Sequence, residues 1–185
     1  MLRSLLCLFA IALSLTLPAS AAEKTELKVW SNDLKDGGTL PNAQVYNDWG
    51  FKGENLSPHL AWSGAPEGTK SFVVTVYDPD APTGSGFWHW VVINIPATAT
   101  ELPRGCGSGK VALPAGALQT RTDMGTPGYM GSAPPAGPVH HYIFTVYALK
   151  VEKLDATADT SAAMIGFMVH GAVLGHASLT VTYGH

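Results

Sequence analysis

The chain is 185 residues long, with 11 Lys and Arg against 14 Asp and Glu and a formal net charge of −3 when histidines are neutral. This length suits one well-cored domain, and the lack of a basic run argues against nucleic acid as a partner. Cys106 is the only cysteine after the first 22 residues, which excludes an intramolecular disulfide or a multi-cysteine metal site in a mature chain.

The first 22 residues have the composition of an export signal. Arg3 supplies a positive charge, an uncharged apolar run extends through Leu17, and small residues that suit signal cleavage follow. We therefore predict a signal peptide over 1–22, a single domain over 23–185, and a periplasmic or secreted location. The next most apolar stretch, 162–174, is shorter than the roughly 20 residues that a membrane-spanning helix needs, so no transmembrane segment is predicted.

Short apolar runs separated by glycine and proline indicate a mainly all-β domain. In chain order the predicted strands are 27–31, 71–77, 90–95, 142–149 and 179–183, and the one predicted helix is 159–174, beginning near Asp159 or Thr160. The first and last strands alternate apolar and polar residues, as outer strands do, whereas the middle three are apolar on both faces and are predicted to be central. The helix is almost wholly apolar, which predicts burial. Residues 101–137, rich in glycine and proline, are predicted to be long loops on a β-sandwich or barrel.

Two polar residues lie where one predicted strand ends and the next begins. Residues 71–77 give way at Asp78 to two X-Pro steps, Asp78-Pro79 and Ala81-Pro82, which remove backbone donors and must end the strand. The next strand begins near His89, so Asp78 and His89 meet at one end of the sandwich if the two strands form a hairpin. Alternation along the second strand places His89 on the face of Val91 and Ile93, pointing into the rim of the core.

A later strand adds further polar groups. His140 and Tyr142 share one face of this strand, whereas His141 points to the other. Imidazoles and a phenol can donate hydrogen bonds to an anion, and Asp78 can accept one from an imidazole, so we predict a small anion pocket in an apolar wall. The same Asp78, with His89 and His140, could instead form a two-histidine, one-carboxylate metal triad.

Three blocks of sequence occur together in this chain: NLSPHLAWSGAPEGTKSFVVTVYDPDAPTG, FWHWVVINIP and YMGSAPPAGPVHHYIFTVYAL. In order and spacing they resemble the signature of the phosphatidylethanolamine-binding proteins, also called Raf kinase inhibitor-like proteins, and most of all the bacterial branch. The resemblance runs from about Leu27 to Tyr183. It implies a β-sandwich of two antiparallel sheets with Greek-key connections, and a small surface pocket for phosphate-like anions and phosphorylated head groups.

The resemblance also implies roles for individual residues. The pocket aspartate, its two histidines, the tyrosine and a wall proline correspond to Asp78, His89, His140, Tyr142 and Pro135. Trp88 stands where animal members carry another histidine, and we predict that it lies beside the ligand. The family implies a non-catalytic protein without metal or cofactor, and its bacterial branch suggests a homodimer.

The predicted function is therefore an exported binding protein for a phosphate-like anion or a phosphorylated or lipid head group. Two alternatives stay open. The same pocket and loops could bind a partner protein, as the kinase- and protease-inhibitor members of the family do. Alternatively, the metal triad could support hydrolysis.

Overall fold

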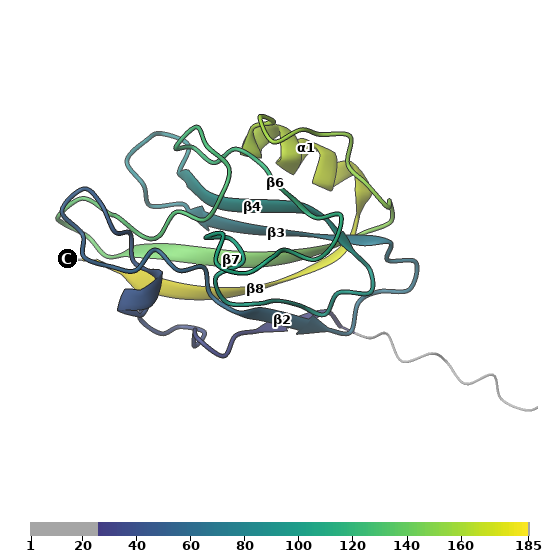
Figure 1. Cartoon of the computed structure of the whole chain (residues 1–185), viewed down its shortest axis with the longest axis horizontal. Helices are drawn as coiled ribbons and strands as arrows, with labels where there is room; N and C mark the ends of the chain where they lie inside the picture. Colours follow the sequence, from purple (N-terminus) through teal and green to yellow (C-terminus); the bar gives the residue numbers. More distant parts are fainter. Residues whose placement is uncertain (1–25, 185) are drawn as a thin grey trace, which may run out of the picture.

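The computed structural model describes residues 26–184, so the predicted signal peptide lies outside the described residues. The described chain folds into two antiparallel sheets and a C-terminal helix, which confirms the predicted fold class (Figure 1). One sheet has the strand order β1-β2-β5 and the other β6-β4-β3-β7-β8. The elements are β1 (Lys28–Trp30), η1 (Asn42–Gln44), β2 (Leu60–Ser63), β3 (Ser71–Asp78), β4 (Phe87–Pro96), β5 (Glu101–Leu102), β6 (Leu118–Gln119), β7 (His140–Leu149), α1 (Ala162–Ala172) and β8 (Val173–Tyr183).

The three strands predicted to be central occupy the middle of the larger sheet. β3 pairs with β4 along a hairpin and with β7 after a long connection through both sheets. A long return to a strand that is not consecutive is the kind of link expected of Greek-key connections. β1 and β8 lie at sheet edges, in agreement with their alternating patterns.

Two apolar clusters hold the layers together. The larger lies between the sheets and includes the buried rings of Phe72 and Phe144. The smaller lies between the opposite face of the five-stranded sheet and α1, and includes Val73, Val91 and Ile165. Residues on both faces of β3 are therefore buried, which explains why its sequence is apolar at successive positions.

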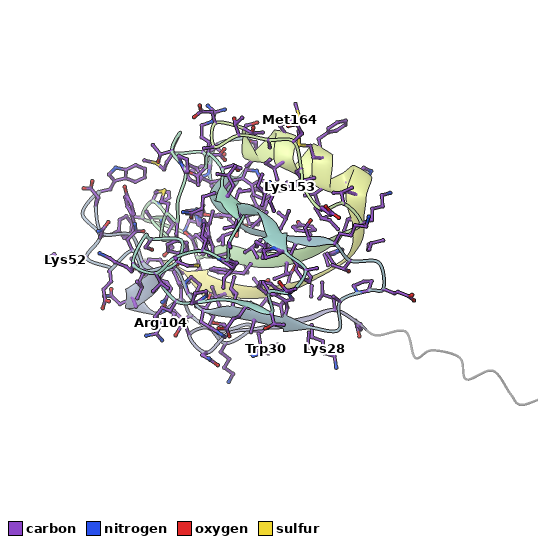
Figure 2. The ribbon with its side chains drawn as sticks, turned by 45° about the vertical axis from the view of Figure 1, so that its right-hand side comes forward. Lys28, Trp30, Lys52, Arg104, Lys153 and Met164 are labelled. Atoms are coloured by element: carbon purple, nitrogen blue, oxygen red, sulfur yellow. The ribbon has the colours of Figure 1, made fainter. Side chains whose placement is uncertain are left out.

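The helix is shorter and more exposed than its composition predicts. It begins after Ser161, whose hydroxyl accepts a hydrogen bond from the N–H of Met164 at 3.3 Å, and it ends where β8 begins at Val173. Met164 points away from the sheet, as Figure 2 shows, and Phe167 is 76% exposed. The prediction of a buried helix was therefore wrong for its outer face. Only one stripe of a helix can contact a sheet, and a uniformly apolar sequence does not reveal which.

The long stretch 101–137 is mainly loop, as predicted, but it contains the two-residue strands β5 and β6. The sequence reading did not identify β2 or η1, both of which are very short. Within residues 26–184, none of the helices combines the length and apolar character needed to cross a bilayer.

Candidate functional site

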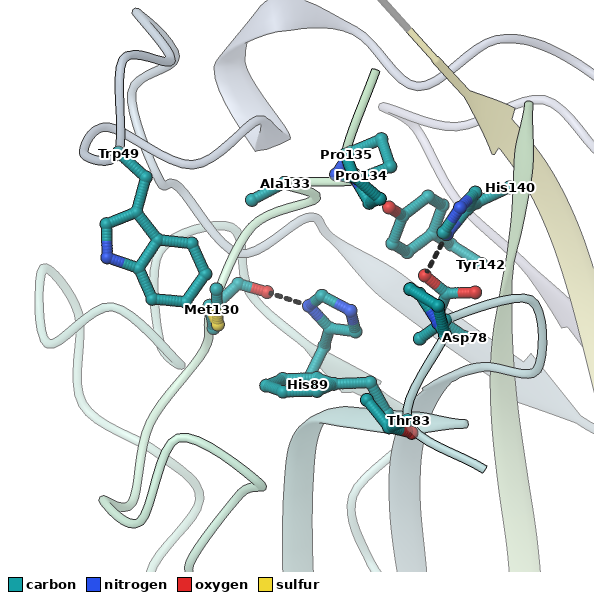
Figure 3. Close-up of a pocket in the computed structure, with 13 residues that line it drawn as sticks. Trp49, Asp78, Thr83, His89, Met130, Ala133, Pro134, Pro135, His140 and Tyr142 are labelled. Carbon is teal, nitrogen blue, oxygen red and sulfur yellow. Dashed lines mark hydrogen bonds and ion pairs between the residues drawn. The ribbon is translucent and has the colours of Figure 1, made fainter. Parts of the chain in front are cut away.

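A pocket of about 110 Å³ opens at the end of the sandwich where β3 ends and where β4 and β7 begin (Figure 3). The predicted hairpin forms, with Asp78 opposite Phe87, so the aspartate and the start of β4 meet as expected. The residues that line the pocket are Trp49, Asp78, Ala81, Pro82, Thr83, Phe87, His89, Met130, Ala133, Pro134, Pro135, His140 and Tyr142. The structure thus brings together every residue predicted for the site except one, Trp88.

A β-bulge in β4 points His89 into this pocket. Val76 pairs with Trp90, whereas the next residue, Tyr77, pairs with Trp88. His89 is therefore the extra residue of β4, and strict alternation is interrupted at this point. Bulges are frequent beside functional sites because they redirect a side chain without ending the strand.

The bulge overturns two predictions. Val91 and Ile93 pack beneath α1, whereas His89 lines the pocket on the opposite face of the sheet, so the predicted shared face was wrong. Trp88 does not line this pocket. It packs against Tyr77, with ring centroids 4.4 Å apart, and lines a different cavity beneath α1. Strict alternation along a sequence cannot reveal one inserted residue. Beyond the inserted residue, every side chain of the strand lies on the opposite face from the one that the alternation predicts.

His89 is buried and neutral at neutral pH. Its Nδ1–H donates to the Met130 carbonyl oxygen at 3.1 Å, because a carbonyl can only accept. Burial lowers the pKa of His89 to about 4, although the nearby charge of Asp78 acts in the opposite direction. The other ring nitrogen, Nε2, carries the lone pair and lies on the side of Asp78 and Tyr142 (Figure 3).

Asp78 and His140 form a buried pair on the pocket floor. The His140 Nδ1–H donates to Asp78 Oδ2 at 2.7 Å, and both side chains are almost wholly buried. The other oxygen of the carboxylate, Oδ1, accepts the backbone N–H of Asp80 at 2.8 Å. Asp78 therefore ends the strand, stabilises the turn that follows, and fixes the tautomer and orientation of His140.

Tyr142 brings a buried hydroxyl to the same pocket. Its oxygen is buried and makes no hydrogen bond of ordinary geometry, although Asp78 and the Ala133 backbone lie near enough to influence its pKa. Burial, with the charge of Asp78 as a smaller cause, raises the pKa of Tyr142, so the phenol stays protonated and able to donate. An orphaned buried hydroxyl costs about 1–3 kcal/mol, and a bound acceptor would remove this cost.

The mouth of the pocket contains residues that the sequence analysis did not identify. Trp49 is 57% exposed, lies beyond Met130 in Figure 3, and has a positive φ of 56°, which is uncommon for a bulky residue. Its ring meets Tyr46 edge-on, with centroids 5.3 Å apart. Such loop residues follow no periodic pattern, so no sequence signal connected Trp49 with the pocket.

A second histidine–carboxylate pair lies outside the pocket. His141 contacts Asp80 through both its backbone N–H and Nδ1, each at 2.7 Å, and these bonds lower the pKa of Asp80. Within the described part of the chain, no three His, Cys, Asp or Glu side chains are grouped so that they could hold a metal ion. The metal-triad alternative therefore receives no support from the geometry.

Residues 30–184 match the family described as phosphatidylethanolamine-binding protein. The chain belongs to this family. A bacterial relative, UPF0098 protein YbhB of Escherichia coli K12, is 59% identical over 157 residues, which cover 85% of this chain and 99% of that protein. UPF0098 protein YbcL of the same organism is 48% identical over 165 residues, which cover 88% of this chain and 90% of YbcL.

Solved structures of the phosphatidylethanolamine-binding protein family have the same fold. The crystal structure of Escherichia coli YbcL, described as a new member of the mammalian family, superimposes with a TM-score of 0.84 at 49% identity and covers 86% of this chain and 99% of that chain. A phosphatidylethanolamine-binding protein from Plasmodium vivax, at 16% identity and a TM-score of 0.52, shares the fold alone; the match covers 86% of this chain and 87% of that one. The family assignment therefore rests on sequence and fold together.

Proposed function

We propose that this protein is a non-catalytic binding protein whose pocket takes a phosphate-like anion or the phosphoryl group of a larger ligand. The observation that carries the proposal is the buried Tyr142 hydroxyl, which makes no hydrogen bond of ordinary geometry and belongs to a residue that lines the same pocket as His89 and His140. A phosphoryl oxygen that accepts from this hydroxyl would satisfy it. The name of the family, which refers to a phospholipid, agrees with a ligand of this class.

The state of the two imidazoles determines how the anion binds. Both Nδ1 atoms are used inside the protein, by the Met130 carbonyl and by Asp78, so only the Nε2 atoms remain for a ligand. A neutral imidazole presents a lone pair at Nε2, which accepts a hydrogen bond from a protonated phosphate oxygen or takes up a proton and then donates. In either case the complex holds a proton between His89 and the ligand.

The size and walls of the pocket limit what can enter. A space of about 110 Å³ admits a phosphoryl group, while the remainder of a larger ligand stays outside the mouth. Met130, Pro135 and Phe87 supply apolar walls, and no lysine or arginine lines the pocket within the described residues. Selectivity therefore rests on hydrogen bonds to a small head and on the fit of the mouth, beside Trp49.

The test is a titration of the protein with inorganic phosphate and with phosphoethanolamine, following the imidazole NMR signals of His89 and His140. We expect saturable shifts at both rings, and an affinity at least about tenfold weaker in Tyr142→Phe, because one hydrogen bond to a charged group contributes about 1.5–3 kcal/mol. Tyr147→Phe is the matched control, since Tyr147 lies on the same strand but lines the cavity beneath α1.

The outcomes separate the proposals. Unchanged phosphate affinity in Tyr142→Phe would contradict the role given to the orphaned hydroxyl. The absence of any shift at His89 and His140 with either compound would overturn the anion site and favour a protein partner at the mouth of the pocket.

Export to the periplasm or medium stays a prediction based on residues 1–22.

A further inference from the structure

A second cavity lies on the opposite face of the five-stranded sheet from the anion pocket, beneath α1. Its volume is about 300 Å³, against about 110 Å³ for the anion pocket. Figure 1 shows α1 lying along this face of the sheet. Cavities of this size, lined by apolar and aromatic groups with a few polar ones, are typical of sites for small molecules.

The walls of this cavity are mainly apolar. Trp88 of β4 and Tyr147 of β7 supply aromatic rings from the sheet, and Ile165 and Val169 supply aliphatic side chains from α1. Ile165 and Val169 are buried, so the helix is anchored to the sheet and the cavity is part of the packed structure. A hydrocarbon chain or ring inserted here would gain apolar contacts on both sides.

Gly166 leaves part of the cavity wall without a side chain. Glycine is a poor residue for the interior of a helix, yet Gly166 stands in the middle of α1 and lines this cavity. Packing does not require it, because a Cβ added at this position would meet no heavy atom within 4 Å. A larger side chain here would fit the helix better. Because Gly166 lines the cavity, substitution at this position is a way to test whether the cavity is used.

The polar groups at the cavity indicate the charge of its ligand. His170 of α1 and His176 of β8 both line it and are both exposed to solvent. The His176 ring stacks near Tyr147, with centroids 5.8 Å apart. No Asp, Glu, Lys or Arg of the described chain lines the cavity. Two imidazoles can donate hydrogen bonds to a carboxylate, whereas an ammonium group would find no carboxylate partner.

We propose that this cavity binds a small amphiphilic carboxylic acid of the medium-chain fatty acid class. The hydrocarbon part lies between Trp88 and α1, and the carboxylate is held by His170 and His176 at the opening. This inference does not depend on the anion pocket, because the two sites open on opposite faces of the sheet and share no lining residue.

The experiment uses decanoate as the probe, with calorimetry for affinity and the NMR signal of the Trp88 indole N–H for location. We expect one decanoate to bind with saturation, to shift the Trp88 signal, and to bind at unchanged affinity when inorganic phosphate saturates the other pocket. Gly166→Leu should raise the melting temperature, because leucine is a better helix former than glycine. It should also weaken decanoate binding at least tenfold, because it adds a bulky side chain to the wall of the proposed site.

Gly171→Leu is the matched control, since Gly171 is also in α1 with open space at its Cβ position but does not line the cavity. It should retain wild-type affinity for decanoate. Decanol and decylamine test the charge: equal binding of all three compounds would overturn the carboxylate assignment. Failure of decanoate to shift Trp88 in the wild type, or full binding by Gly166→Leu, would overturn the site itself. The wild-type NMR result decides the matter even if a variant does not fold.

Discussion

His89 is buried, hydrogen-bonded and part of the pocket wall. Because it is buried, we expect it to make the free energy of unfolding depend on pH. Burial lowers its pKa from 6.5 to about 4 in the folded protein, so the unfolded chain binds more protons between these two values. The contribution of His89 to the free energy of unfolding is therefore present above pH 6.5 and is lost as the pH falls toward 4. Its size is roughly 3 kcal/mol, from about 1.4 kcal/mol per pKa unit.

His89→Gln removes this titration while keeping an uncharged amide of similar length. Between pH 6.5 and 4, we expect the wild-type free energy of unfolding to fall by up to about 3 kcal/mol more than that of the variant. Urea unfolding at several pH values across this range measures the difference. If the free energy of unfolding falls with pH equally in the wild type and the variant, His89 is not held neutral by the fold.

The two histidine–aspartate pairs form a natural comparison. Asp78 and His140 are buried together, whereas Asp80 and His141 are largely exposed. Asp78→Ala leaves a buried imidazole N–H without a partner, and breaking a buried pair in this way costs about 3–5 kcal/mol. Asp80→Ala should cost about 1 kcal/mol or less, because exposed pairs are screened by water. Equal losses in denaturant unfolding would contradict this account of the pocket floor.

At the scale of elements, the bulge in β4 decides which residues reach each cavity. With regular alternation, Trp88 and Trp90 would point to the same side of the sheet. In the structure Trp90 lies between the sheets, while Trp88 lies beneath α1 and His89 lines the pocket at the end of the sandwich. One inserted residue thus supplies side chains to sites on both faces of the same sheet.

Substitutions on the two faces of α1 test which face contacts the sheet. Ile165 is 1% exposed, so Ile165→Ala should cost about 2–5 kcal/mol in the free energy of unfolding, through lost burial and the cavity left behind. Phe167 is 76% exposed, and Phe167→Ala should change stability by less than about 0.5 kcal/mol. Thermal or denaturant unfolding of both variants measures these two stability losses. A large loss in Phe167→Ala would mean that its ring is covered in solution.

At the scale of the molecule, the sandwich brings distant parts of the chain to one end. The Met130 carbonyl accepts from His89, 41 residues earlier, and Asp78 accepts from His140, 62 residues later. Neither contact is local, so both depend on the complete fold. The anion binding that we propose for this pocket should therefore be lost together with global unfolding, not with the separation of a single element.

Local patterns in the sequence determined the central strands and the positions of several pocket residues. Apolar runs identified β3, β4 and β7 as central strands. The X-Pro steps that begin at Asp78 predicted the end of β3, and the spacing of His140 and Tyr142 put both on one face. These features depend on near neighbours in the chain, where steric limits and strand periodicity act directly. The family resemblance then supplied Pro135.

Only the tertiary structure decided the remainder. It moved Trp88 to the far face, placed Trp49 at the mouth, gave His89 the Met130 carbonyl as its partner, and left the outer side of α1 exposed. Each of these outcomes depends on an inserted residue or on packing between segments far apart in the chain. Propensity and periodicity depend only on a residue and its near neighbours in the sequence, so they cannot predict contacts between distant segments.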